Sequence, residues 1–312
     1  MSVLGCHGIC GGLMPDDAGT LGMQRTFQAQ LDAAVAALSH KRVTDDHIHE
    51  ARKELKKARA TLRLLRDALG KTVYARENAA LRDAARPLGN VRDARVLPEV
   101  LDQLVSRNGR KARALPLGPL HAALSRDFAR ERTRMTHAEI SRIASKVRAV
   151  QRRSSRWHVA RGGWTELGSG LARTYRRSRK AFAASRSRTT DDLHELRKQL
   201  KYLRYEFQLL QPTSPEKVGK LEDRAHSLTD DLGEDHDLAV LEQRIEDAHA
   251  FSLDARASDA VLAMIRRRRR RVQDDAFDCG RRLYEERPKH LRRRLGRYWR
   301  RWRDEGTPAA RQ

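Results

Sequence analysis

The sequence predicts an all-α protein made of two similar helical bundles, and three observations lead to this fold class. Ala, Leu, Arg, Lys and Glu, which are strong helix formers, dominate the 312 residues. Aromatic residues make up only 5% of the chain, which argues against a β-rich sandwich or barrel. A basic helical motif and a second sequence block both occur twice, in the same order. The repeat indicates two bundles related by a pseudo-two-fold axis.

In the first half of the chain, helical periodicity begins near Met23. Thr44 and the acidic pair that follows it are typical of an N-cap, and Gly70 is expected to end the helix that starts there. Residues 87–89 contain a proline and a glycine and are expected to break a helix, and residues 108–119 are expected to form a loop. The expected helices of this half cover 26–38, 44–69, 72–85, 93–105 and 120–153.

The second half repeats this organisation after a glycine-rich midpoint. Thr189 is expected to cap a long helix that ends before Pro212, and a glycine at position 233 is expected to break the next helix. The expected helices of this half cover 170–184, 190–210 and a stretch from 215, followed by two helices that carry 266–271 and 291–303.

The two halves can be aligned residue by residue. The segment HEARKELKKARATLRLL begins at His49 and HELRKQLKYLRYEFQLL begins at His194, an offset of 145 residues. The block LGNVRDARVL of the first half matches LGEDHDLAVL of the second at an offset of 144 residues, which aligns Asp93 with Asp237. Two blocks at nearly the same offset predict duplicated structure.

The domain division follows from the repeat. One domain is expected over 23–305, with a first helical repeat over about 23–155, a second over about 170–305, and disordered ends at 1–22 and 306–312. In the leader, Cys6, His7 and Cys10 lack an obvious fourth ligand, so we expect no metal site and no cofactor. Three cysteines without a CxxC motif fit a reducing cytosol, and no stretch approaches the ~18 apolar residues of a membrane span.

The charge of the chain predicts a polyanionic partner. Lys and Arg total 65 against 41 Asp and Glu, which gives a net charge of +24 and a pI of about 10.8. A charge of this size usually accompanies nucleic acid, an anionic membrane or a phosphate polymer. The charge alone does not choose among these three.

The repeated helices carry their cations on one face, because an α-helix turns by about 100° per residue. Leucine and alanine side chains lie on the opposite face of each helix. The cationic side of the first helix consists of His49, Arg52, Lys53, Lys56 and Arg63, with Arg59 at its edge. That of the second consists of His194, Arg197, Lys198 and Lys201, flanked by Arg204.

Such a face could be an ordinary solvated surface, but like charges on neighbouring turns repel one another. A bound anion would relieve this repulsion, so two matching faces favour anion binding. Glu50 and Glu54 are expected at the flank and rear of the first helix. The histidines are expected to contact the anion or support the structure rather than hold a metal.

These motifs are similar to those of the CHAD family, the conserved histidine α-helical domain. The resemblance rests on HEARKELKKAR and HELRKQLKYLRY, with support from RTYRRSRKAF and the two LG-x-x-x-D blocks. It implies two four-helix bundles around a central basic groove or pore. It also implies non-catalytic binding of inorganic polyphosphate in the cytoplasm, with targeting to polyphosphate granules in some members. No E-x-E-x-K signature of a fused triphosphate enzyme is found, so a stand-alone member is expected.

The resemblance assigns polyphosphate binding to the cationic residues of both motifs. Tyr175, Arg176 and Arg179 are expected to extend the groove ahead of the second motif. Gln208 stands where the first motif has Arg63, and Tyr202 replaces a lysine, so the two halves are not expected to contribute equally. The residues assigned in this way are His49, Arg52, Lys53, Lys56, Arg59, Arg63, Tyr175, Arg176, Arg179, His194, Arg197, Lys198, Lys201 and Arg204.

Two alternatives stay open at this point. A basic nucleic-acid-binding protein could use the C-terminal aromatics at Tyr298, Trp299 and Trp302, although helical spacing favours a core role for them. A metal-dependent polyphosphate phosphohydrolase could use His236 with Asp237, although the match of Asp237 to the first half disfavours this. The six arginines at 266–271 wrap round a helix, so they cannot all face one groove.

Overall fold

The computed structural model describes residues 19–159, 162–247 and 254–306, and within them it confirms an all-α fold without strands. Two short 3₁₀ turns, at 185–187 and 211–213, join helices of the second half. The helices of the first half are α1 (Thr20–Leu38), α2 (Asp45–Leu64), α3 (Arg66–Leu69), α4 (Lys71–Arg107), α5 (Gly109–Arg113), α6 (Gly118–Arg134) and α7 (His137–Ser154). Those of the second half are α8 (Trp164–Ala184), α9 (Thr190–Leu210), α10 (Pro215–Glu246), α11 (Ala255–Leu283) and α12 (Pro288–Gly306).

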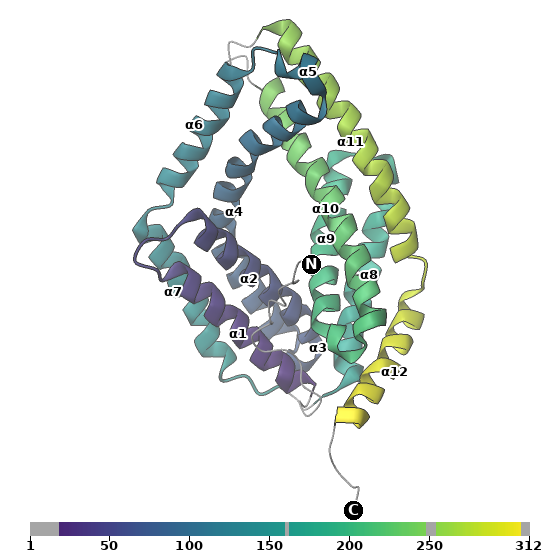
Figure 1. The fold of residues 1–312 in the computed structure, drawn as a ribbon. Helices are drawn as coiled ribbons and strands as arrows, with labels where there is room; N and C mark the ends of the chain where they lie inside the picture. The colour runs from purple at the N-terminus through teal and green to yellow at the C-terminus, as the bar shows by residue number, and fades with distance from the viewer. Residues whose placement is uncertain (1–18, 160–161, 248–253, 307–312) are drawn as a thin grey trace, which may run out of the picture.

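The helices are arranged in a ring (Figure 1). The first half lies on the left of this view and the second half on the right. The halves meet below, where α2 and α3 pack on α8 and α9, and above, where α4 approaches α10. No helix of the described residues is long and apolar enough to span a bilayer.

Three apolar clusters hold the ring together. One lies between α1, α2, α4 and α7 and includes the fully buried Phe27 and Leu55. A second is formed by α8 to α12 and includes Phe207 and Trp299. A third joins the C-terminal part of α4, with α5 and α6, to α10 and α11 of the other half, and Leu120 is buried there. The pseudo-two-fold relation of the halves stays a prediction.

The N-caps predicted for the two motif helices are confirmed. The Thr44 hydroxyl accepts a hydrogen bond from the His47 amide at 3.4 Å, and the Thr189 hydroxyl accepts one from the Asp192 amide at 3.2 Å. Each cap satisfies an amide that has no partner inside the helix, which fixes where the helix begins. The cationic faces of α2 and α9 therefore start at defined positions.

The predicted breaks at 87–89 and 232–233 are wrong, because α4 and α10 run through them. Pro87 removes one backbone donor and costs about 3 kcal/mol in a helix interior. Leu88, Val91 and Leu232 are almost fully buried, and each such side chain gains about 1.5–3 kcal/mol from burial. Packing therefore outweighs the local preference for a break.

Other boundaries also differ from the sequence prediction. The expected loop at 108–119 contains α5, and the helix expected over 120–153 is divided after Arg134 because Thr136 caps α7. α1 begins at Thr20, so the last residues of the expected leader are helical. Residues 1–18, with Cys6, His7 and Cys10, and residues 307–312 lie outside the described part of the chain.

Gly170 of α8 lies where the two halves touch, and its replacement by alanine should destabilise the protein by about 2 kcal/mol or more. A Cβ atom there would lie 2.8 Å from the Cα and the carbonyl oxygen of Leu64 at the end of α2. Backbone atoms cannot move aside as a side-chain tip can. Urea unfolding of the Gly170→Ala variant measures the effect.

Gly233→Ala is the matched control, since Gly233 also lies inside a helix but has no atom within 4 Å of the place that a Cβ would take. Alanine is the better helix former, so this variant should gain up to about 1 kcal/mol. Equal stability of the two variants would contradict a tight contact between α2 and α8.

Candidate polyanion-binding cavity

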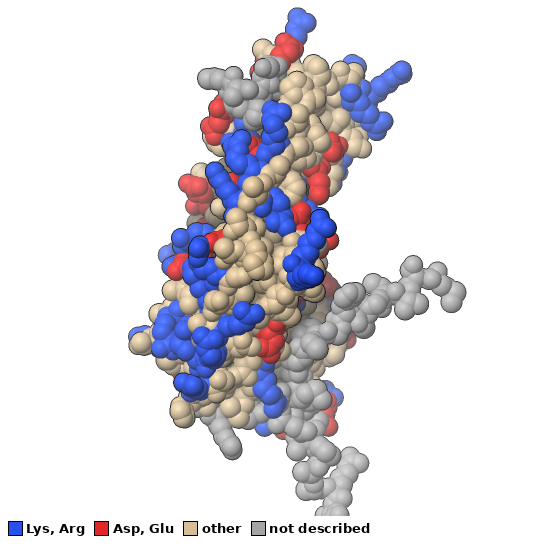
Figure 2. Space-filling model, turned by 90° about the vertical axis from the view of Figure 1, so that its left-hand side faces the viewer, with Lys and Arg blue, Asp and Glu red and all other residues tan. Residues whose placement is uncertain are grey.

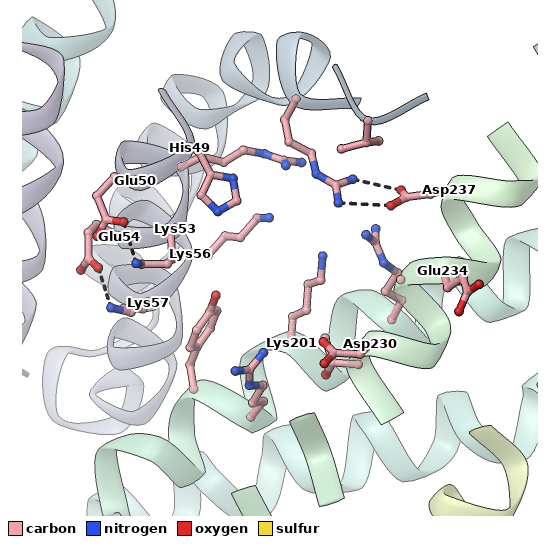
Figure 3. A pocket seen from close by; sticks show the side chains of 18 of the residues that line it. His49, Glu50, Lys53, Glu54, Lys56, Lys57, Lys201, Asp230, Glu234 and Asp237 are labelled. Carbon is pink, nitrogen blue, oxygen red and sulfur yellow. Dashed lines mark hydrogen bonds and ion pairs between the residues drawn. The ribbon is translucent and has the colours of Figure 1, made fainter. Parts of the chain in front are cut away.

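A cavity of about 960 Å³ opens between α2 and α4 of the first half and α9 and α10 of the second. α1 contributes Ala29 and Ala33 to its wall. Most of the charged side chains that reach it are cations (Figure 3). Those from the predicted set are His49, Arg52, Lys53, Lys56, Arg197, Lys201 and Arg204. The structure thus brings residues of both repeated motifs to one space.

Lys56 and Lys201 point into this space from different walls (Figure 3). Burial, followed by repulsion from Arg52 and Arg197, lowers the pKa of Lys56 to about 7. Burial, followed by repulsion from Lys56 and Arg197, lowers the pKa of Lys201 to about 5. Neither ammonium group has a hydrogen bond or an ion pair within the described ranges. An anion between them would favour the charged form of both.

Arg197 adds a buried donor to the same region. Its side chain is only 8% exposed, and its Nε has no hydrogen-bond partner in the part of the chain that the structure describes. Burial is also the main cause that lowers its pKa. A buried guanidinium nitrogen without a partner costs free energy unless a ligand or water satisfies it.

Arg92 and two aspartates were missed as functional residues, although the repeat carried a signal for them. Arg92 binds Asp237 through two hydrogen bonds of 3.0 and 3.2 Å, and so links α4 to α10 across the cavity. The Arg52 Nη2 atom lies 3.6 Å from Asp93 Oδ1. The aspartates are the matched pair of the two LG-x-x-x-D blocks. They offset part of the cationic charge at one end of the cavity.

The two motif histidines lie in different surroundings. His49 lines the cavity, and burial followed by Arg92 lowers its pKa. His194 does not line it, and its ring lies 5.0 Å from the ring of His236. Burial lowers the pKa of His194 as well, and that of His236 to about 4. His49 is thus expected to be neutral near pH 7 and to offer an anion a single hydrogen bond.

Arg59 and Arg63 do not line the cavity. Both donate to Asn78 Oδ1, at 3.1 Å each, and both lie against the ring of Tyr202. The Arg63 guanidinium is 3.6 Å from the ring centroid, so this pair is a cation–π contact. Tyr202, which replaces a lysine in the second motif, therefore packs against two arginines of the first motif.

Two of the motif lysines have acidic partners on their own helices. Lys53 pairs with Glu50 at 2.6 Å, and Lys198 pairs with Glu195 at 2.7 Å. Lys198 is exposed and does not reach the cavity, whereas Lys53 is half-buried and lines it. Their charges are therefore more screened than those of the inner lysines.

Glu50 and Glu54, expected at the flank and rear of the helix, both line the cavity. Its wall extends round α2 toward α1 and so includes the flank of the helix. Glu54 is nearly buried and holds Lys57 at 2.5 Å. This side of the cavity is consequently less positive than the side with Lys56.

The expected extension of the groove by 175–179 does not reach the cavity. Tyr175 is fully buried in the second cluster. Its hydroxyl group donates a hydrogen bond shared by the carbonyl oxygens of Leu283, at 3.0 Å, and Glu286, at 2.9 Å. Arg176 and Arg179 lie on the outside of α8, in a separate recess. α8 thus supplies core packing on one side and cations on the other.

Half of the arginine run of α11 is paired with acidic side chains. Arg266, Arg268 and Arg269 pair with carboxylates of α10 at 2.6–3.0 Å, and these pairs fix α11 along α10. Trp299, in the basic C-terminal segment, is 1% exposed, which confirms a core role. The carboxylates that pair with the run are Glu234, Asp235, Glu242 and Glu246.

The described residues contain no group of three or more His, Cys, Asp or Glu side chains placed to hold a metal ion. Lysines and arginines are the largest group of charged residues in the lining of this cavity. Lysine supplies compact charges and arginine supplies planar pairs of donors, and both suit the oxygens of phosphate groups.

Comparison with known proteins agrees with this architecture. The family model of the CHAD domain matches residues 25–246. The crystal structure of the CHAD domain from the plant Ricinus communis has a similar fold, with a TM-score of 0.59 and 15% sequence identity over 86% of this chain and 93% of that chain. A search of curated proteins gives no significant match. The family match covers well over half of the sequence, and the chain belongs to the CHAD domain family.

Proposed function

We propose that the protein binds inorganic polyphosphate in the central cavity and does not turn it over. The observation that carries this proposal is the pair of inward lysines, Lys56 and Lys201, which face each other without an acidic partner in the described residues. Two such groups are unfavourable in the empty cavity, and phosphate oxygens would stabilise both. The family membership supports the same ligand class.

The lining of the cavity favours a phosphate polymer over nucleic acid. Proteins that bind single strands present aromatic side chains on which bases stack. Tyr205 is the one aromatic residue among the described lining residues, and it stands among charged groups. A ligand made only of phosphates needs no such platform. Binding of this kind would also place the protein on polyphosphate granules in the cytoplasm.

Calorimetric titration with long-chain polyphosphate, with duplex DNA and single-stranded RNA as competitors, tests this function. We expect polyphosphate to bind in preference to both nucleic acids at equal phosphate concentration. The affinity should fall steeply between about 50 and 200 mM salt, because neutralising several phosphates releases counterions.

Equal or better binding of nucleic acid would overturn the assignment. An assay for released phosphate, with and without divalent cations, covers the catalytic alternative. Phosphate release that depends on a divalent cation would show that the protein is a phosphohydrolase and that the His236–Asp237 pair needs a new interpretation.

A further inference from the structure

A second basic recess lies on the outside of the ring, between α8 and α11. Its volume is about 480 Å³. Five of its lining residues are cations and none of those described is acidic: Arg176, Arg179, Lys180, Arg186 and Arg281. The described lining of this recess thus carries no carboxylate, whereas the wall of the central cavity carries both signs of charge.

The spacing of α8 explains how these cations converge. Arg179 and Lys180 stand three and four residues after Arg176, and Ala183 stands four and three residues after them, so all four share one face of α8. The small side chain of Ala183 leaves room between its longer neighbours. The recess therefore results from a methyl group surrounded by long basic side chains.

These cations have few partners within the protein. Arg179 donates from Nε to the Tyr284 carbonyl at 3.0 Å, which orients its guanidinium and leaves its terminal nitrogens for another acceptor. Arg176, Lys180 and Arg186 have no acidic partner among the residues that the structure describes. Arg281, by contrast, pairs with Asp278 of its own helix, and Arg266, Arg268 and Arg269 of α11 pair with carboxylates of α10.

The N-terminus of α12 lies at the edge of the same recess, through Pro288. Its first turn contains no acidic side chain, but the Glu286 carboxylate just ahead of α12 pairs with Arg294 and lies beside this end of the helix. The attraction for an anion therefore comes from the side chains of α8.

The floor of the recess indicates the chemistry of its ligand. Phe182 and Tyr284 form part of it, but they are only 9% and 4% exposed. They offer no free ring on which a nucleic-acid base could stack. The recess therefore suits a ligand that is recognised through charge and phosphate oxygens alone.

We propose that this recess is a second phosphate site, which binds a segment of a condensed phosphate chain. The choice of condensed phosphate as the ligand rests on the proposed function of the central cavity. The evidence that the recess binds an anion does not depend on that function. With two sites, one protein molecule holds two segments of a long polymer or joins two polymers. Binding of a long chain then gains from the raised local concentration at the second site.

Calorimetric titration with tripolyphosphate at about 150 mM salt, a probe too short for avidity, tests the proposal through the number of sites. We expect two sites in the native protein. Arg176→Glu with Lys180→Glu should remove one of them, or weaken it by at least about tenfold. Lys56→Met with Lys201→Met should remove the other.

A charge-matched control comes from another basic face. Lys and Arg side chains gather over the lower part of the face formed by α6 and α7 (Figure 2). Arg142→Glu with Lys146→Glu on α7 changes the net charge as much as the recess variant does, and both residues are exposed. This control should keep two sites. Ala183→Phe, which fills the recess without a change of charge, should behave like the recess variant.

The outcomes separate the two proposals. If the recess variant and Ala183→Phe keep two sites, or if the α7 control loses one as well, the second site is overturned. If the recess variants lose a site but the cavity variant loses none, the recess is supported and the function of the cavity is overturned. If the native protein has a single site and only the cavity variant removes it, the proposed recess site is overturned and the cavity site is supported.

Discussion

Replacement of both Lys56 and Lys201 by methionine should weaken the binding of long-chain polyphosphate by at least about 100-fold and stabilise the free protein. Each lysine should donate a charge-assisted hydrogen bond worth about 1.5–3 kcal/mol, and every 1.4 kcal/mol is a factor of ten in affinity. In the empty cavity the same groups are destabilising, since burial lowers both pKa values far below that of a free lysine. Calorimetry and urea unfolding measure the two effects.

The gain in the free energy of unfolding should be about 1–2 kcal/mol near pH 8. Both lysines are protonated in the unfolded chain at this pH. In the folded protein burial disfavours the protonated form, so folding costs free energy. Water in the cavity reduces the penalty below the value for a sealed core.

Lys53→Met with Lys198→Met is the control, with the same residue types on the same two helices. Each of these lysines is paired with a glutamate on its own helix, so binding should weaken by less than about tenfold and stability should change little. The interpretation of the inner pair fails if the two double variants lose affinity equally, or if the inner variant is less stable than the native protein.

The affinity for long-chain polyphosphate should rise as the pH falls from 9 to 7. The inner lysines have pKa values of about 7 and about 5 in the free protein, and a bound anion raises both. The complex therefore binds protons that the free protein has released. Each proton taken up increases the affinity by up to about tenfold per pH unit. The cavity histidine has a lowered pKa and titrates below this range in the free protein.

Calorimetry at pH 8, in two buffers with different protonation enthalpies, counts these protons. We expect an uptake of between about one and two protons per cavity. The Lys56→Met, Lys201→Met variant should lose this uptake, while a contribution from the ends of the polymer would persist. An affinity that is constant from pH 9 to pH 7 would show that the lysines are already charged in the free protein.

Local signals were sufficient for much of the fold. The caps at Thr44 and Thr189 could be predicted because a side chain and an amide three residues away form each of them. The cationic faces followed from helical periodicity. The continuity of α4 through Pro87 could not be predicted, because it depends on apolar contacts with helices far away in the sequence.

The candidate site shows the same division. The helical wheel places Lys56 and Lys201 on cationic faces, but only the fold shows that they enter one cavity. Periodicity also could not separate Arg63, which packs on Tyr202, from residues that line the cavity. Tyr175 stood in a basic segment and yet is buried, because one face of α8 belongs to the core.

The third apolar cluster has a consequence for the way in which the chain folds. Leu97, Leu101 and Leu104 of the first half pack with Leu238 and Leu241 of the second, about 140 residues away in the sequence. Contacts of such large separation slow folding, because the entropy of closing a long loop is lost before the contacts form. Although two sequence blocks recur in both halves, neither half contains all the partners that cover its own apolar surface. The two halves should therefore fold as one cooperative unit, and an intermediate with only the first half formed would expose the upper part of α4.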